Sequence, residues 1–190
     1  MLLLWINVST GEKILDISSV PPIQVDELKG TMKLIKPGGM MVIYRTGRAP
    51  SSIPSGSRIE CARGSIYLSL GDVKIRVRKE GICRIWRDEK TGTAYLIMDE
   101  KSKGDVDILV EDSFIKLERD SKVKIEIDDL GRSVKFTIIN GNVRAVYEGR
   151  VKRMTQGAVL ILVLGKEVIA EFIPPPELEM LEEVSPYIPQ

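Results

Sequence analysis

The residues with the clearest potential for chemistry in this 190-residue chain are acidic ones that lie close together in sequence. Asp105 and Asp107 are two residues apart, so on a strand both carboxylates point to the same side, and Glu111 follows soon after. Hard cations such as calcium bind where several oxygens converge in this way. Because acidic side chains beside a turn are more often solvated, we treat these three only as weak metal-ligand candidates.

Histidine, the commonest catalytic base and transition-metal ligand, does not occur in the sequence. Its absence removes the usual partner of a catalytic serine, although a serine–lysine arrangement is compatible with the composition. Paired carboxylates can hydrolyse glycosides, but aromatic residues that would stack on a sugar make up only 5% of the chain. The glycines are not followed by the helix and lysine of a phosphate-binding loop. We therefore predict that the protein is not an enzyme and needs no cofactor.

Cys61 and Cys83 are the only cysteines in the sequence. Two sulfurs without histidine do not make a structural zinc site. The pair fits two buried thiols, and a disulfide between neighbouring strands is an alternative that spacing alone does not decide. Abundant charge, many Ile and Val and few Gln are typical of hyperthermophile proteins, in which an intracellular disulfide is less surprising.

A run of cations near the middle of the chain is the most prominent polar feature. After Gly71, apolar and basic residues alternate, which places the basic ones on one side of a strand. The candidate interaction residues are Lys74, Arg76, Arg78, Lys79, Arg84 and Arg87. Such a stripe can bind the phosphates of nucleic acid or another polyanion, although Trp86 is its only interleaved aromatic residue. The alternatives are a solvated strand face, or an edge that charge protects from unwanted pairing.

Charge is unevenly distributed along the chain, although the formal net charge is only +1. That small net charge creates no overall field that steers the protein toward nucleic acid or a membrane. Residues 58–87 hold eight Lys/Arg and three Asp/Glu, whereas residues 167–183 hold six Glu and no Lys/Arg. We expect the basic and acidic segments to make contact, within one molecule or between neighbouring copies.

The first residues form a run that is apolar on both faces of an expected strand. The candidate self-association residues are Leu2, Leu4, Trp5 and Ile6. Both faces of such a strand are covered by other parts of the same chain, or the strand pairs with the sheet edge of a neighbouring molecule. The run lacks the basic start and the length of a secretory signal, and no other segment reaches the roughly 20 apolar residues that cross a membrane. Unless a leader has been removed, we expect a cytoplasmic protein or a part of an assembled particle or filament.

Alternating apolar and polar residues, interrupted by turn residues, predict many short antiparallel strands. Asn140–Gly141 is the strongest hairpin signal, because both residues tolerate positive φ. We expect an all-β protein, either a sandwich or a stacked and duplicated β domain, with a short C-terminal helix over 177–184. The expected units are an N-terminal β segment (1–47), a main β domain (48–173) and a proline-rich acidic tail (174–190).

An internal repeat has an offset of 40 residues (112 − 72). Residues 72–85 align without a gap with 112–125, so that Ile75 matches Ile115 and Cys83 matches Val123. A duplication with copies at 72–110 and 112–150 predicts stacked β units that share one core. Chance is the alternative, because any two alternating strands joined by a turn align in this way.

Several turn-and-strand segments follow the pattern of a known family. The segments are Ser55–Ile59, Gly64–Leu70 and Gly71–Ile75, with a later copy at Glu111–Leu117 that is followed by Ser121. Through them, residues 39–149 resemble the FecR-type domain. The resemblance implies a non-catalytic β-rich module, which in the best-known members relays a binding signal on the envelope side of a membrane regulator. This sequence shows neither a membrane helix nor a recognisable regulatory segment before the domain, so we do not expect the anti-sigma role.

These observations favour a non-enzymatic structural or protein-interaction subunit that self-associates through β edges or complementary charge. One alternative is a FecR-like sensing or signalling module that acts through a partner protein. A second is polyanion or nucleic-acid binding through the basic strand face at 74–87. The expected partner is the protein itself, as a homo-oligomer, or another protein, and nucleic acid is the less favoured choice.

Overall fold

The computed structural model describes residues 22–128, 130–165 and 169–175. All regular structure in these residues is β-strand, with no helix among them, which confirms the predicted all-β class. The predicted helix at 177–184 lies outside the described residues, as do the candidate self-association residues at the N-terminus.

The described residues form fifteen strands joined by antiparallel pairing. They are β1 (Ile23–Ile35), β2 (Met41–Arg45), β3 (Ser52–Ile53), β4 (Ser57–Leu70), β5 (Val73–Arg78), β6 (Ile82–Arg87), β7 (Ala94–Met98), β8 (Val106–Val110), β9 (Ser113–Leu117), β10 (Lys122–Ile127), β11 (Ser133–Asn140), β12 (Asn142–Tyr147), β13 (Arg150–Thr155), β14 (Val159–Val163) and β15 (Ile169–Ile173).

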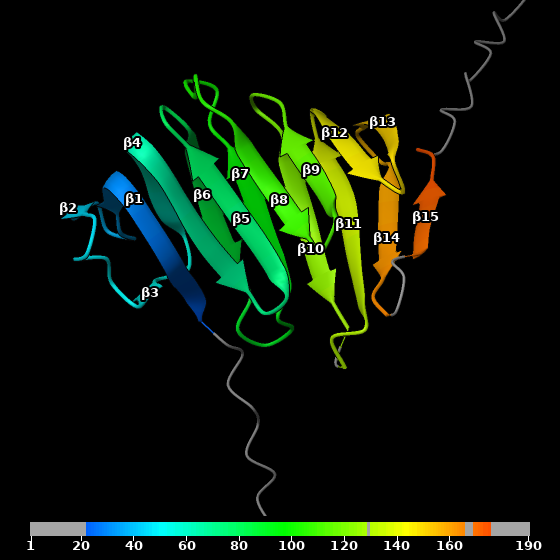
Figure 1. Cartoon of the computed structure of the whole chain (residues 1–190), viewed down its shortest axis with the longest axis horizontal. Coiled ribbons are helices and arrows are strands. Elements are labelled where there is room, and N and C mark those ends of the chain that lie inside the picture. Colours follow the sequence, from blue (N-terminus) through cyan, green and yellow to red (C-terminus); the bar gives the residue numbers. More distant parts are fainter. Residues whose placement is uncertain (1–21, 129, 166–168, 176–190) are drawn as a thin grey trace, which may run out of the picture.

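The strands form one continuous sheet that curls back on itself into two facing layers (Figure 1). The first layer has the order β4-β5-β8-β9-β12-β13, and the second has the order β4-β6-β7-β10-β11-β14-β15. The long strand β4 belongs to both layers, because residues 65–70 pair with β5 and residues 57–60 pair with β6. After β5 the chain alternates between the layers, placing two strands in the second layer and then two in the first.

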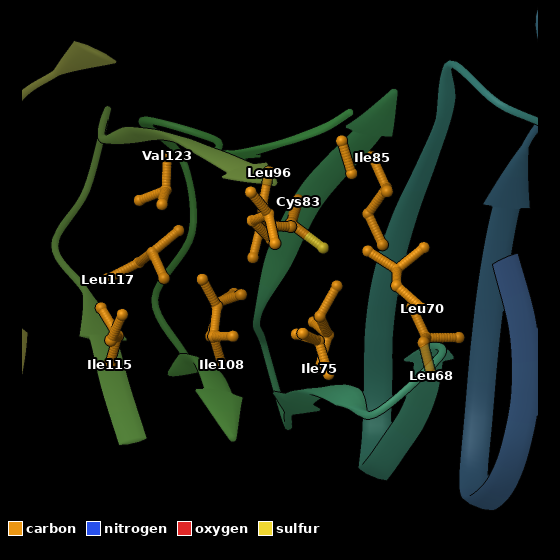
Figure 2. Packing of buried hydrophobic residues seen from close by; sticks show 14 of the residues in the cluster. Leu68, Leu70, Ile75, Cys83, Ile85, Leu96, Ile108, Ile115, Leu117 and Val123 are labelled. Carbon is orange, nitrogen blue, oxygen red and sulfur yellow. The ribbon is translucent and has the colours of Figure 1, made fainter. Parts of the chain in front are cut away.

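The core lies between the two layers, where every second residue of each strand points inward. In the first layer Ile75 pairs with Ile108 and Ile108 pairs with Ile115, and all three are buried. In the second layer Leu96 pairs with both Ile85 and Val123. These three side chains face the isoleucines of the first layer (Figure 2). Burial of each such side chain contributes about 1.5–3 kcal/mol. Turning a strand over would expose all of its apolar side chains, so the alternation in the sequence determines which face of the strand is inside.

The two segments of the internal repeat occupy equivalent places in this arrangement. Ile75 on β5 and Ile115 on β9 lie in the same row of the first layer. Cys83 on β6 and Val123 on β10 are both buried in the second layer. The repeat thus coincides with one advance of the chain through both layers, and the duplication stays a prediction.

At one end of the molecule, β1 runs alongside β4 and crosses with it from the first layer to the second. The crossing is at the pair Gly30–Gly64, where both residues have positive φ (112° and 78°). A Cβ added to Gly64 would lie 1.7 Å from the carbonyl oxygen of Lys29, so only glycine allows the two backbones to approach this closely. β2 pairs with β1 beyond this crossing, and in Figure 1 it lies at the opposite end of the long axis from β15.

Candidate functional site

The three candidate metal ligands do not form a cation site in this fold. The Asp107 carboxylate accepts hydrogen bonds from the Arg76 guanidinium at 2.7 and 3.0 Å, and Asp105 forms an ion pair with Lys116 at 2.8 Å. Glu111 lies apart, exposed in the turn between β8 and β9. Within residues 22–128, 130–165 and 169–175, no three acidic or cysteine side chains are grouped so that they could hold a metal ion.

The six candidate interaction residues do not form one surface. Lys74, Arg76 and Arg78 project from β5 on the outer face of the first layer, and the last two also form ion pairs with Asp107. Because the chain crosses between layers after Arg78, Arg84 projects from β6 on the outer face of the second layer. Lys79 lies in the connecting turn.

Arg87, the sixth residue, points inward and is only 9% exposed, and burial lowers its pKa. It borders a cavity of about 640 Å³ near β1, β2 and β3, whose apolar lining includes Leu34, Tyr44 and Ile53. The hydroxyl of Ser55, also in this cavity, donates to the carbonyl oxygen of Arg87 (2.9 Å) and accepts from its N–H (2.7 Å). Ser55 therefore fixes the backbone here, and this hydroxyl is already engaged with the chain.

Trp86 lies on the outer face of the second layer and is 43% exposed. The fold adds an aromatic neighbour that the sequence analysis did not find, because Tyr95 on β7 pairs with Trp86 and their ring centroids are 5.3 Å apart. The Lys122 ammonium lies 5.0 Å from the Tyr95 ring centroid. Such cross-strand aromatic pairs stabilise a sheet, and this one shares its face with Arg84 alone among the six candidate cations.

Both cysteines are free thiols buried in the core. Burial raises the pKa of the Cys61 thiol to about 11 and that of the Cys83 thiol to about 12. Because the thiolate is the reactive form, these residues pack as small apolar side chains and are poor nucleophiles.

The edges of the two layers differ strongly in how they are protected from pairing with another chain. An edge strand exposes unpaired N–H and C=O groups, and natural proteins protect it with charged side chains, inward-pointing lysine or proline. At the end of the first layer, β13 carries Arg150, Lys152 and Arg153. Lys152 lies opposite the buried Ala145, so its side chain is on the core-facing side of β13. Its ammonium lies 3.8 Å from the ring centroid of Phe172 on β15, so Lys152 covers the core where the two layers end.

The edges at β15 and at β1 are also protected from pairing with another chain. On β15, at the end of the second layer, the Ala170 N–H donates to the Glu148 carboxylate at 3.1 Å. Pro174 and Pro175 follow that strand and have no N–H to donate. At the opposite end of the first layer, the exposed side of β1 carries the ion pair between Glu27 and Lys29 at 3.0 Å.

The edge strand β2, at the end of the second layer, has no comparable protection. Within the described part of the chain it pairs only with β1. Met40, Met41 and Ile43 are 56%, 58% and 54% exposed, and the only charged residue of the strand is Arg45 at its end. Alternation in the sequence does not show that this strand is an edge, since pairing partners cannot be read from it.

Comparison with known proteins does not assign the chain to a family. No protein-family model matches it, and no curated protein and no solved structure matches it either. The FecR-type resemblance therefore stays a prediction. The described residues contain no helix with the length and apolar character needed to cross a bilayer.

Proposed function

We propose that this protein is a non-enzymatic structural or protein-interaction subunit that self-associates through an edge of its β-sheet. The observation that carries the proposal is the unprotected edge strand β2, on which Met41 and Ile43 are both more than half exposed. Exposed, apolar and unpaired strands pair readily with another chain, because backbone hydrogen bonding and apolar burial then act together.

The surroundings of the acidic residues considered as metal ligands, and of Ser55 beside the cavity, also favour a non-enzymatic role. Asp105 and Asp107 are engaged in ion pairs on an outer face, and the Ser55 hydroxyl is bonded to backbone. A general acid or base needs a carboxylate whose environment adjusts its proton affinity beside a bound substrate. These side chains instead stabilise the outer face and the turn in which they lie.

Self-association through edges is favoured over association through charge. Several of the cations on the outer faces are paired within the molecule, as in Lys124–Glu126 at 2.7 Å and Arg58–Asp99 at 3.1 Å. Exposed ion pairs contribute little and are screened by salt, so they do not provide a strong site for a second copy.

The proposal is tested by measuring the mass of the full chain by light scattering over a wide dilution series, at low and high salt. We expect a mass above the 21.2 kDa of one chain that decreases on dilution and does not decrease with salt. Complexes that dissociate in high salt would indicate charge-driven association instead. A monomer at every concentration would refute the proposal.

A further inference from the structure

Resting on that proposed self-association, we infer its geometry: two copies pair antiparallel through β2 and form a closed two-fold dimer with Ile43 at the axis. Three properties of the described residues support this geometry: the direction of the backbone groups of β2, the residues that would meet across the axis, and the protection of the other edges.

The hydrogen bonds at the two ends of β2 show which residues face β1. The Lys36 N–H donates to the carbonyl oxygen of Met40 at 2.9 Å, and the Thr46 N–H donates to that of Gly30 at 3.0 Å. Hydrogen-bonded and non-hydrogen-bonded pairs alternate along an antiparallel ladder. Residues with even numbers on this strand therefore direct their backbone groups toward β1, and residues with odd numbers direct theirs away from it.

Met41, Ile43 and Arg45 are consequently the residues whose N–H and C=O groups face outward. Two copies of β2 placed antiparallel with Ile43 opposite Ile43 of the partner subunit would satisfy these groups, with two hydrogen bonds for each of the three pairs. In this register Met41 lies opposite the partner's Arg45, so the two arginines are not opposite each other. On the other face, Val42 lies opposite the partner's Tyr44, an aromatic and β-branched pair of the kind that stabilises sheets.

The protection of the remaining edges decides between a dimer and a filament. Head-to-tail growth requires β2 to pair with a different edge, and such an arrangement gives a larger ring or an open filament instead of a two-fold dimer. The available edges are β13 with its inward Lys152, β15 with its N–H bonded to Glu148, the charged side of β1, and β3, which has only two residues. A strand of two residues is too short to pair along the length of β2. Each of the other three edges would lose an existing contact or bury a charge on pairing, whereas β2 loses none. Pairing of β2 with itself makes the second layer continuous through both copies. Among the described residues it leaves no further unprotected edge.

The experiment compares the masses of three full-length proteins by light scattering. We expect the natural sequence to form a dimer of 42.4 kDa (2 × 21.2), and Ile43→Lys to be a monomer because it places two ammonium groups at the axis. The matched control is Val151→Lys, the same type of change at a 68% exposed residue on β13, which should remain a dimer. Circular dichroism of each variant verifies that it is folded.

A disulfide cross-link tests the register itself. Directly opposed residues in a hydrogen-bonded pair have Cα atoms about 5.5 Å apart, which is within the range of a disulfide. Oxidised Ile43→Cys should therefore run as a covalent dimer on a non-reducing gel, whereas Val151→Cys should not. The two natural cysteines do not interfere because they are buried.

The possible results separate this inference from the function on which it rests. A monomeric natural protein refutes both. An oligomer that Ile43→Lys leaves intact, or that grows beyond a dimer, refutes the β2 dimer but not self-association. Deletion of residues 1–8 should leave the dimer unchanged. Loss of the dimer on this deletion, together with no Ile43→Cys cross-link, would assign the edge to the N-terminal segment and overturn the inference.

Discussion

Replacing Ile108 with alanine tests the two-layer arrangement on which the positions of all edges depend. Ile108 lies in the middle of the first layer, between Ile75 and Ile115, and is fully buried against the second layer (Figure 2). Its neighbour Leu109 lies on the same strand but points to the outer face, where it is partly exposed and lies opposite Phe114. The two residues are therefore a matched pair that differs mainly in which side of the sheet each occupies.

The expected costs differ because only one of the two changes leaves a cavity. Truncation of a buried isoleucine to alanine loses transfer free energy and creates a void, which together destabilise a protein by about 2–5 kcal/mol. Truncation of Leu109 loses part of its cross-strand contacts with Phe114 and Lys74, which are each worth about 1 kcal/mol or less. For a chain of this size each kcal/mol lowers the melting temperature by about 2–4 °C, so Ile108→Ala should melt roughly 10 °C lower.

Urea unfolding at a fixed protein concentration measures both free energies of unfolding. Fixed concentration is needed because association adds to the apparent stability. We expect a lower midpoint for Ile108→Ala with an unchanged slope, and a midpoint for Leu109→Ala close to that of the natural protein. Equal losses for the two variants, or a larger loss for Leu109→Ala, would refute the assignment of inner and outer faces.

Three further predictions concern the core thiols and the strand crossing. Cys61 and Cys83 should resist alkylation in the native state at pH 8 and react in urea, whereas native reactivity would contradict their burial. Burial raises each thiol pKa from 9.0 to about 11 or 12, so the unfolded chain loses these protons at a lower pH than the folded protein does. The free energy of unfolding should therefore fall as the pH rises above about 9. The variant Cys83→Ala should weaken this pH dependence. Gly64→Ala should destabilise the protein by at least about 2 kcal/mol more than Gly38→Ala, since both glycines have positive φ but only the first would place its Cβ against backbone. Equal losses in thermal unfolding would contradict that close approach.

Much of the fold was predictable from the sequence because alternation is a local property. In Val73–Arg78 every second residue is apolar, and those residues are the buried ones. The match between Ile75 and Ile115 indicated stacked units, and the two residues do lie in one row of the core. Gly64 shows the limit of such reasoning, since nothing local indicates that another backbone passes within contact distance.

The candidate site residues were harder to interpret, because their neighbours come from other parts of the chain. The basic stripe was one feature in sequence, yet Arg76 and Arg84 lie on opposite outer faces because the chain crosses between layers after Arg78. The carboxylate of Asp107, considered as a metal ligand, is instead the ion-pair partner of Arg76. The metal-ligand hypothesis for Asp107 and the interaction hypothesis for Arg76 thus concerned the two partners of one ion pair.

The amino-acid sequence by itself determined that this protein is built from short antiparallel strands, which of their residues face inward, and that its chemistry cannot depend on histidine. Only the tertiary structure decided which strands end the layers and how each end is protected. A strand such as β2 has the same local pattern at an edge or in the middle of a sheet. What makes it an edge is that, among the described residues, a strand pairs with it on one side only, and that depends on the path of the chain.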